Sequence, residues 1–97
     1  MKKLNFKILS LNFIKKKPSL KEVEGYQIDS IVAVYRDRHY WYVTELESGI
    51  CVCKGKTKQD ALNEYQKDET KEKIKNAHKT DTYMHLKNVF EEMKGQI

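Results

Sequence analysis

The stretch that decides the fold is residues 40–57, YWYVTELESGICVCKGKT. Aromatic and β-branched residues flank a Glu-Ser-Gly sequence at residues 47–49, which is the pattern of two strands joined by a tight turn. Glycine at the third turn position can supply the left-handed conformation of a three-residue hairpin loop. Thr57 and Asp60 then form a capping-box pattern at the start of a helix. The stretch therefore predicts strand, turn, strand and helix.

A further strand is predicted before this stretch. Residues 26–36, YQIDSIVAVYR, are rich in β-branched and aromatic residues. A two-residue turn at Asp37 and Arg38 would join them to the next strand, and the result would be a three-stranded antiparallel meander. The expected pairs are Tyr35 with Tyr40, Val34 with Trp41, Ala33 with Tyr42, Val32 with Val43, Thr44 with Val52, and Val43 with Cys53.

Because side chains alternate along a strand, this register assigns the residues to two faces. One face would carry Val32, Val34, Trp41, Val43, Cys51 and Cys53. The other would carry Ile31, Ala33, Tyr35, Tyr40, Tyr42, Leu46, Ile50 and Val52. Both faces are apolar, so one layer of helices cannot cover the sheet. Either a second element packs on the tyrosine-bearing face, or that face is a recognition surface.

The N-terminal segment adds an ambiguous element. Leu4, Phe6 and Ile8 alternate, and Leu9, Leu11 and Phe13 alternate on the other parity, which favours a fourth strand with a bulge. The spacing of Leu4, Ile8 and Leu11 also suits a helix. Pro18 marks a break. Ser19 and Glu22 form a capping-box pattern that predicts a short connector helix.

Two helices are predicted after the sheet. The first begins near Lys58 and extends to about residue 67, and a bend or break is expected at residues 67–71 because the apolar stripe then falls out of phase. The second covers residues 82–94 and could cover a sheet face or mediate a homodimer. The predicted class is α+β, with a three- or four-stranded antiparallel sheet packed by two C-terminal helices, in one domain over residues 1–97.

The net charge of +5 is unevenly distributed. Residues 1–58 hold twelve Lys and Arg against six Asp and Glu, a net charge of +6. Residues 59–97 hold seven against eight, a net charge of −1. The positive half favours an anionic partner, such as nucleic acid, although a solvated lysine-rich surface has the same composition.

The candidate binding residues come from this positive half. Nucleic-acid binding requires cations that neutralise phosphates and can use aromatic rings that stack on bases. The candidate cations are Lys15, Lys16, Lys17, Arg36, Arg38, His39, Lys54, Lys56 and Lys58, and the candidate rings are Tyr35, Tyr40 and Tyr42. In the competing interpretation, the tyrosines are core residues packed against a helix.

Neither catalysis nor metal binding is predicted. No spacing links a nucleophile to a base, and the sequence Gly55-Lys56-Thr57 lacks the upstream glycine of a phosphate-binding P-loop. Cys51 and Cys53 do not have a zinc-binding spacing, and they make no disulfide framework. We expect a non-enzymatic cytoplasmic protein without cofactor or metal, and without a signal peptide or a membrane-spanning segment.

Two families resemble the segment of residues 26–67. Gly55, Thr57 and Ala61 resemble the end of the third strand and the Thr-x-x-x-Ala helix start in the double-stranded-RNA-binding-like domain of HicB-type antitoxins. Thr57, Lys58 and Ala61 are also similar to the helix start of arm-type DNA-binding domains of phage and transposon integrases. In composition, the chain looks like small phage and mobile-element proteins, including anti-CRISPR inhibitors.

These resemblances imply two functional hypotheses. The first is a phage or mobile-element inhibitor that binds a host protein or nucleoprotein complex, such as a CRISPR effector, through its basic surface. The alternative is a regulatory module that binds DNA or RNA directly. In both hypotheses the basic half of the chain makes the contact.

Overall fold

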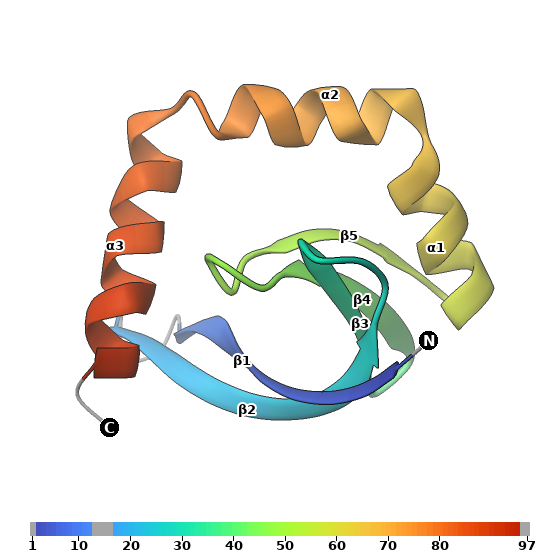
Figure 1. Ribbon diagram of the computed structural model, residues 1–97, viewed down its shortest axis with the longest axis horizontal. Coiled ribbons are helices and arrows are strands. Elements are labelled where there is room, and N and C mark those ends of the chain that lie inside the picture. Colours follow the sequence, from blue (N-terminus) through green and yellow to red (C-terminus); the bar gives the residue numbers. More distant parts are fainter. Residues whose placement is uncertain (1, 13–16, 96–97) are drawn as a thin grey trace.

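The computed structural model describes residues 2–12 and 17–95. It has the predicted α+β class, but the described part holds five strands and three helices. The strands are β1 (Lys2–Asn12), β2 (Lys17–Gln27), β3 (Val32–Asp37), β4 (Tyr40–Glu45) and β5 (Cys51–Gly55). The helices are α1 (Lys58–Gln66), α2 (Asp68–Ala77) and α3 (Asp81–Gly95). The strands are antiparallel neighbours in chain order, and the helices frame the sheet on three sides (Figure 1).

The first two strands form a long hairpin. The predicted strand at residues 4–13 is confirmed up to Asn12, and residue 13 lies outside the described residues. The connector helix expected from Ser19 is wrong, because that segment belongs to β2. Phe6 lies opposite Val23 in this hairpin, and burial of such cross-strand pairs outweighs a local capping pattern.

The predicted strand at residues 26–36 is divided by a turn. Asp29 Oδ1 accepts hydrogen bonds from the backbone N–H groups of Ile31, at 2.7 Å, and Val32, at 2.9 Å. An aspartate that binds the backbone two or three residues ahead favours a turn over an extended strand. Residues 26 and 27 therefore end β2, and β3 begins at Val32.

The β3–β4 turn lies one residue later than predicted. Its central residues are Arg38 and His39, and Arg38 has a φ of +56°. Tyr35 therefore pairs with Tyr42 instead of Tyr40. The shift along β4 is two residues, so the side chains of these two strands keep their predicted faces.

A β-bulge changes the register of β5. Val43 pairs with Cys53 as predicted, but Thr44 pairs with Cys51, because the register shifts between Val43 and Thr44. The prediction that both cysteines share one face is therefore wrong: Cys51 lines a groove on the tyrosine-bearing face. Val52, which was expected on that face, packs with the cluster beneath α1.

Different elements cover the two faces of the sheet. On the tyrosine-bearing face the β1–β2 hairpin curls over β3 and β4 (Figure 1), and the core there consists of Phe6, Ile8, Ala33 and Tyr35. On the opposite face α1 packs through Ala61 on Val32, Val34 and Val43. The second covering element that the sequence required is therefore the N-terminal hairpin.

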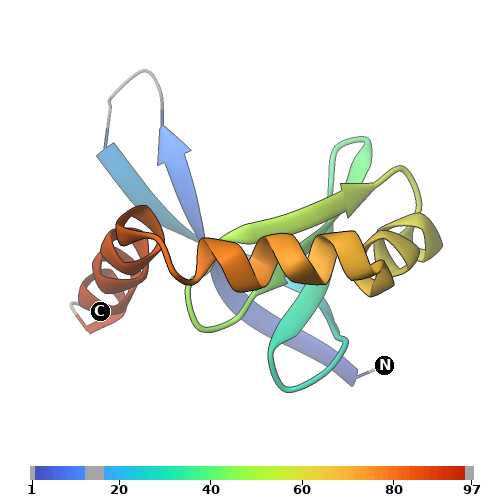
Figure 2. The same ribbon diagram turned by 90° about the horizontal axis from the view of Figure 1, so that it is seen from above.

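Helices α1 and α3 begin near the predicted positions, whereas α2 was not predicted: the charged segment after the expected break at residues 67–71 is a helix of its own. Thr57 Oγ1 accepts a hydrogen bond from the Asp60 backbone at 3.0 Å, and the helix breaks at Lys67, where ψ is +138°. Thr80 Oγ1 accepts a hydrogen bond from the Tyr83 backbone at 3.1 Å at the start of α3. Figure 2 shows α2 crossing above the sheet between α1 and α3. Among the described helices, none is long and apolar enough to span a membrane.

Candidate binding surface

One end of the sheet gathers most of the predicted cations. Trp41 pairs with Gly55, so the β3–β4 turn lies beside the end of β5 and the start of α1. We define the basic end as Arg36, Arg38, His39, Lys54, Lys56 and Lys58, all exposed except the half-buried Lys58. Across residues 2–12 and 17–95, no ion pair joins the arginines or lysines of the basic end to a carboxylate.

The basic end has two sides. On one side Arg36 lines a small cavity, of about 100 Å³, together with Lys3, Tyr26 and Trp41. The ammonium group of Lys58 lies 3.9 Å from the centre of the Tyr26 ring. On the other side are Arg38 and Lys54, and Lys54 Nζ lies 4.8 Å from the centre of the Tyr40 ring. The sequence names these cations together. The fold places Arg36 and Lys58 on one side and Arg38 and Lys54 on the other.

The lysines predicted at residues 15–17 are not placed relative to the basic end. Lys15 and Lys16 lie outside the described residues. Lys17 begins β2 and pairs with Asn12 through the backbone. The structure therefore places no side chain of this run relative to the basic end.

The three predicted tyrosines differ in exposure. Tyr35 is 6% exposed and packs edge-on against Phe6, with ring centroids 5.9 Å apart. Its other neighbour, Tyr42, is stacked on it at 5.5 Å. Burial raises the pKa of Tyr35 to about 12. Tyr35 is therefore a core residue, whereas Tyr40 and Tyr42 are half-buried and reach the surface.

A groove opens on the tyrosine-bearing face. It has a volume of about 880 Å³ and lies between the β1–β2 hairpin, the β3–β5 strands and α3. We call it the tyrosine groove. Its apolar wall comprises Ile8, Leu9, Tyr35, Tyr42, Ile50 and Leu86, and its charged side chains are Lys21, Asp37 and Arg38. The backbone N–H of Leu9 donates to the Gly49 carbonyl at 2.9 Å, so β1 contacts the β4–β5 turn beside this groove.

A buried polar cluster at the opposite end of β4 was not predicted. Glu45 is 1% exposed, and its carboxylate accepts a hydrogen bond from the Tyr83 hydroxyl and lies 2.7 Å from His78 Nε2. The His78 and Tyr83 rings are stacked, with centroids 4.3 Å apart. Burial by itself raises the pKa of Glu45, but hydrogen bonds from Tyr83, His78 and Ser48 lower it below its ordinary value of 4.5.

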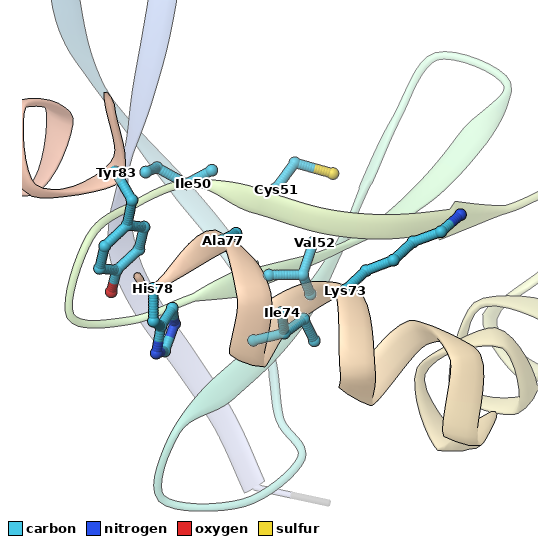
Figure 3. A pocket seen from close by; sticks show the side chains of 8 residues that line it. All are labelled: Ile50, Cys51, Val52, Lys73, Ile74, Ala77, His78 and Tyr83. Carbon is cyan, nitrogen blue, oxygen red and sulfur yellow. The ribbon is translucent and has the colours of Figure 1, made fainter. Parts of the chain in front are cut away.

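The Glu45 cluster ties the last two helices to the sheet. His78 follows α2 and Tyr83 lies in the first turn of α3, so both contacts reach Glu45 from distant parts of the sequence. A small cavity of about 180 Å³ beside the cluster is lined largely by Ile50, Val52, Ile74 and Ala77. In Figure 3 the Cys51 sulfur points away from His78, so these side chains do not form a nucleophile–base pair.

The only sequence signal for this cluster was the position of Glu45. It alternates with Trp41 and Val43 along β4 and so belongs on a covered face, where a carboxylate requires partners. The sequence does not identify those partners, because they lie 33 and 38 residues away.

Comparison with known proteins identifies no relative. No protein-family model, no curated protein and no solved structure matches this chain. Within the described ranges, no three His, Cys, Asp or Glu side chains are grouped so that they could hold a metal ion.

Proposed function

We propose that this protein is a non-enzymatic inhibitor of the phage or mobile-element kind that binds a host nucleoprotein complex, such as a CRISPR effector. Its basic end would contact the nucleic acid of that complex. The observation that carries the proposal is the position of Arg36, Arg38 and Lys56 at one end of the sheet, as exposed cations without a carboxylate partner among the described residues. Such cations are available to neutralise phosphates.

Ring contacts at the basic end support the same role. Lys54 and Lys58 each lie over a tyrosine ring, which holds the ammonium group near the surface without neutralising its charge. The +6 net charge of residues 1–58 adds a long-range attraction for an anionic partner.

A matched pair of triple variants tests this proposal. In R36A/R38A/K56A, three charges are removed from the basic end. In K73A/K75A/K79A, three charges are removed from exposed positions in and after α2. Each tagged variant is used to capture partners from lysate of the native host, with and without nuclease. We expect a nucleoprotein complex to be captured by the wild type and the α2 control, and to be lost with the basic-end variant.

Direct nucleic-acid binding is the second candidate, favoured by the half-buried rings of Tyr40 and Tyr42 beside Lys54. It predicts tight binding of purified DNA or RNA that weakens steeply as salt rises. Removal of three phosphate contacts would then reduce the slope of log K against log salt by about 2 to 3.

Weak binding of naked nucleic acid, with capture that survives nuclease, would favour the inhibitor. Equal capture by both triple variants would refute both candidates.

A further inference from the structure

Arg38 occupies a position that suits glycine better than arginine. It is the first central residue of the two-residue β3–β4 turn, and its φ of +56° lies in the left-handed region. Glycine adopts this conformation without steric strain, whereas the Cβ of any other L-residue is crowded. Strained residues of this kind cluster at functional sites.

The Arg38 side chain lines the tyrosine groove and carries its unneutralised charge. The two other charged residues of the groove, Lys21 and Asp37, form an ion pair, with Lys21 Nζ 3.8 Å from Asp37 Oδ2. Arg38 has no carboxylate partner in the described part of the chain. The groove therefore combines one free guanidinium group with an extensive apolar wall.

This combination favours a carboxylate-bearing polypeptide over nucleic acid. A guanidinium group binds a carboxylate through two parallel hydrogen bonds. The aliphatic wall of Ile8, Ile50 and Leu86 suits an apolar side chain, and the Tyr35 ring is already packed against Phe6 and Tyr42. A second copy of this chain is a poorer fit, because its acidic C-terminal helix buries Phe90, its largest apolar side chain.

We propose that the tyrosine groove binds an extended acidic polypeptide segment of a partner protein. An aliphatic or aromatic side chain of that segment would lie against Ile8 and Leu86, and a neighbouring carboxylate would bind Arg38. This inference rests on the proposed role as a binding protein. It assigns Arg38 to the protein component of the target and leaves the nucleic-acid contact of the basic end to Arg36 and Lys56.

A peptide experiment tests the groove directly. The probes are synthetic octapeptides in which one Phe or Leu is flanked by Asp or Glu, with the same peptides carrying Lys instead of the acids as controls. Binding is measured by fluorescence anisotropy, and methyl NMR shifts of Ile8, Ile50 and Leu86 locate the site. We expect acidic peptides to bind with dissociation constants on the order of 10–100 μM, and lysine peptides not to bind.

Three variants identify the contribution of Arg38. Arg38→Gly removes the guanidinium group and the backbone strain together, so it should fold at least as well as the wild type while peptide binding falls about tenfold. Arg38→Lys keeps the charge without the planar fork and should lose part of the affinity. Lys75→Ala makes the same change in net charge at an exposed position of α2, outside the groove, and should bind the peptide like the wild type.

The results of the peptide experiment test the groove, and they can be told apart from the results of the capture experiment, which test the basic end. The inference is overturned if no acidic peptide binds at millimolar concentration, if Arg38→Gly and Lys75→Ala weaken binding equally, or if a twelve-nucleotide oligothymidylate displaces the peptide from the groove. The Arg36→Ala/Lys56→Ala double variant leaves Arg38 in place. If this variant abolishes capture while no acidic peptide binds, the groove inference fails and the proposed function stands. Failure of capture with a positive peptide result would instead refute only the proposed nucleoprotein target.

Discussion

Glu45 is a carboxylate with almost no contact with solvent. Its hydrogen bonds with Tyr83 and His78 compensate for the loss of hydration, and the result is a pKa below the ordinary value. Because the folded pKa is lowered, the ionised group stabilises the fold at pH values above 4.5. This stabilisation is lost as the pH falls from about 4.5 through the lower, folded pKa.

Glu45→Gln therefore gives a pH-dependent prediction. At pH 7 the substitution should lower the free energy of unfolding by about 2–4 kcal/mol, because a buried charge-assisted network is broken. The difference from the wild type should shrink as the pH falls below 4.5. Urea unfolding at pH 7 and at pH 3.5 measures both quantities. A difference of the same size at both pH values would show that ionisation of Glu45 does not stabilise the fold.

Arg38 gives a prediction of opposite sign. Replacement of Arg38 by glycine should raise the free energy of unfolding by about 1 kcal/mol, because glycine relieves the left-handed strain at φ +56°. Arg36→Gly is the matched control, since Arg36 lies within β3. Glycine there should lower stability by about 0.5–1 kcal/mol. Urea midpoints compare the two, and a loss of stability in both would contradict the strain assigned to Arg38.

At the scale of the elements, Phe90 packs α3 against the β4–β5 turn, in addition to the contact of Tyr83 with Glu45. Phe90 is 1% exposed, and it packs so closely on Gly49 that a Cβ there would overlap its ring. Gly49 also has a φ of +69°, which confirms the left-handed glycine predicted for the β4–β5 turn. The turn residue thus serves both the hairpin and the docking of α3.

Phe90→Ala should lower the free energy of unfolding by about 3–4 kcal/mol, because it removes a fully buried aromatic side chain. Val89→Ala is the adjacent control on the same helix, where the side chain is half-buried and the loss should be about 1 kcal/mol. Thermal unfolding followed by circular dichroism measures both. Equal losses would argue against Phe90 as the anchor of α3.

At the scale of the whole molecule, burial is concentrated in the central strands. Val32, Ala33, Val34 and Tyr35 of β3 are all buried, whereas the buried position of α2 is Thr70. The first residue before α2, Lys67, makes no side-chain capping hydrogen bond. The molecule should therefore open locally at α2 long before the sheet unfolds.

Native-state hydrogen exchange tests this order. The amides of β3 should exchange only through global unfolding, and those of α2 should exchange through local opening with protection lower by at least about 100-fold. The amides of α1, which is packed through Ala61, are the internal reference for a well-anchored helix. Protection of α2 equal to that of β3 would mean that the helices and the sheet open as one unit.

The sequence alone determined the local elements and the alternation of side chains. The apolar faces of β3 and β4, the left-handed Gly49, the Thr57 cap and the break at Lys67 all follow from residues close in the chain. It also named the cations of the basic end, although their arrangement at one end of the sheet comes from the structure. These properties depend on local backbone preferences and on side-chain periodicity.

Only the tertiary structure decided which elements cover the two faces. The segment after Ser19 has a helical capping pattern, but pairing with β1 makes it a strand that covers Tyr35. The bulge at Thr44 and the partners of Glu45 likewise depend on contacts between distant segments. Which of these contacts form depends on how much apolar surface the whole folded chain buries. A short stretch of sequence does not show that amount.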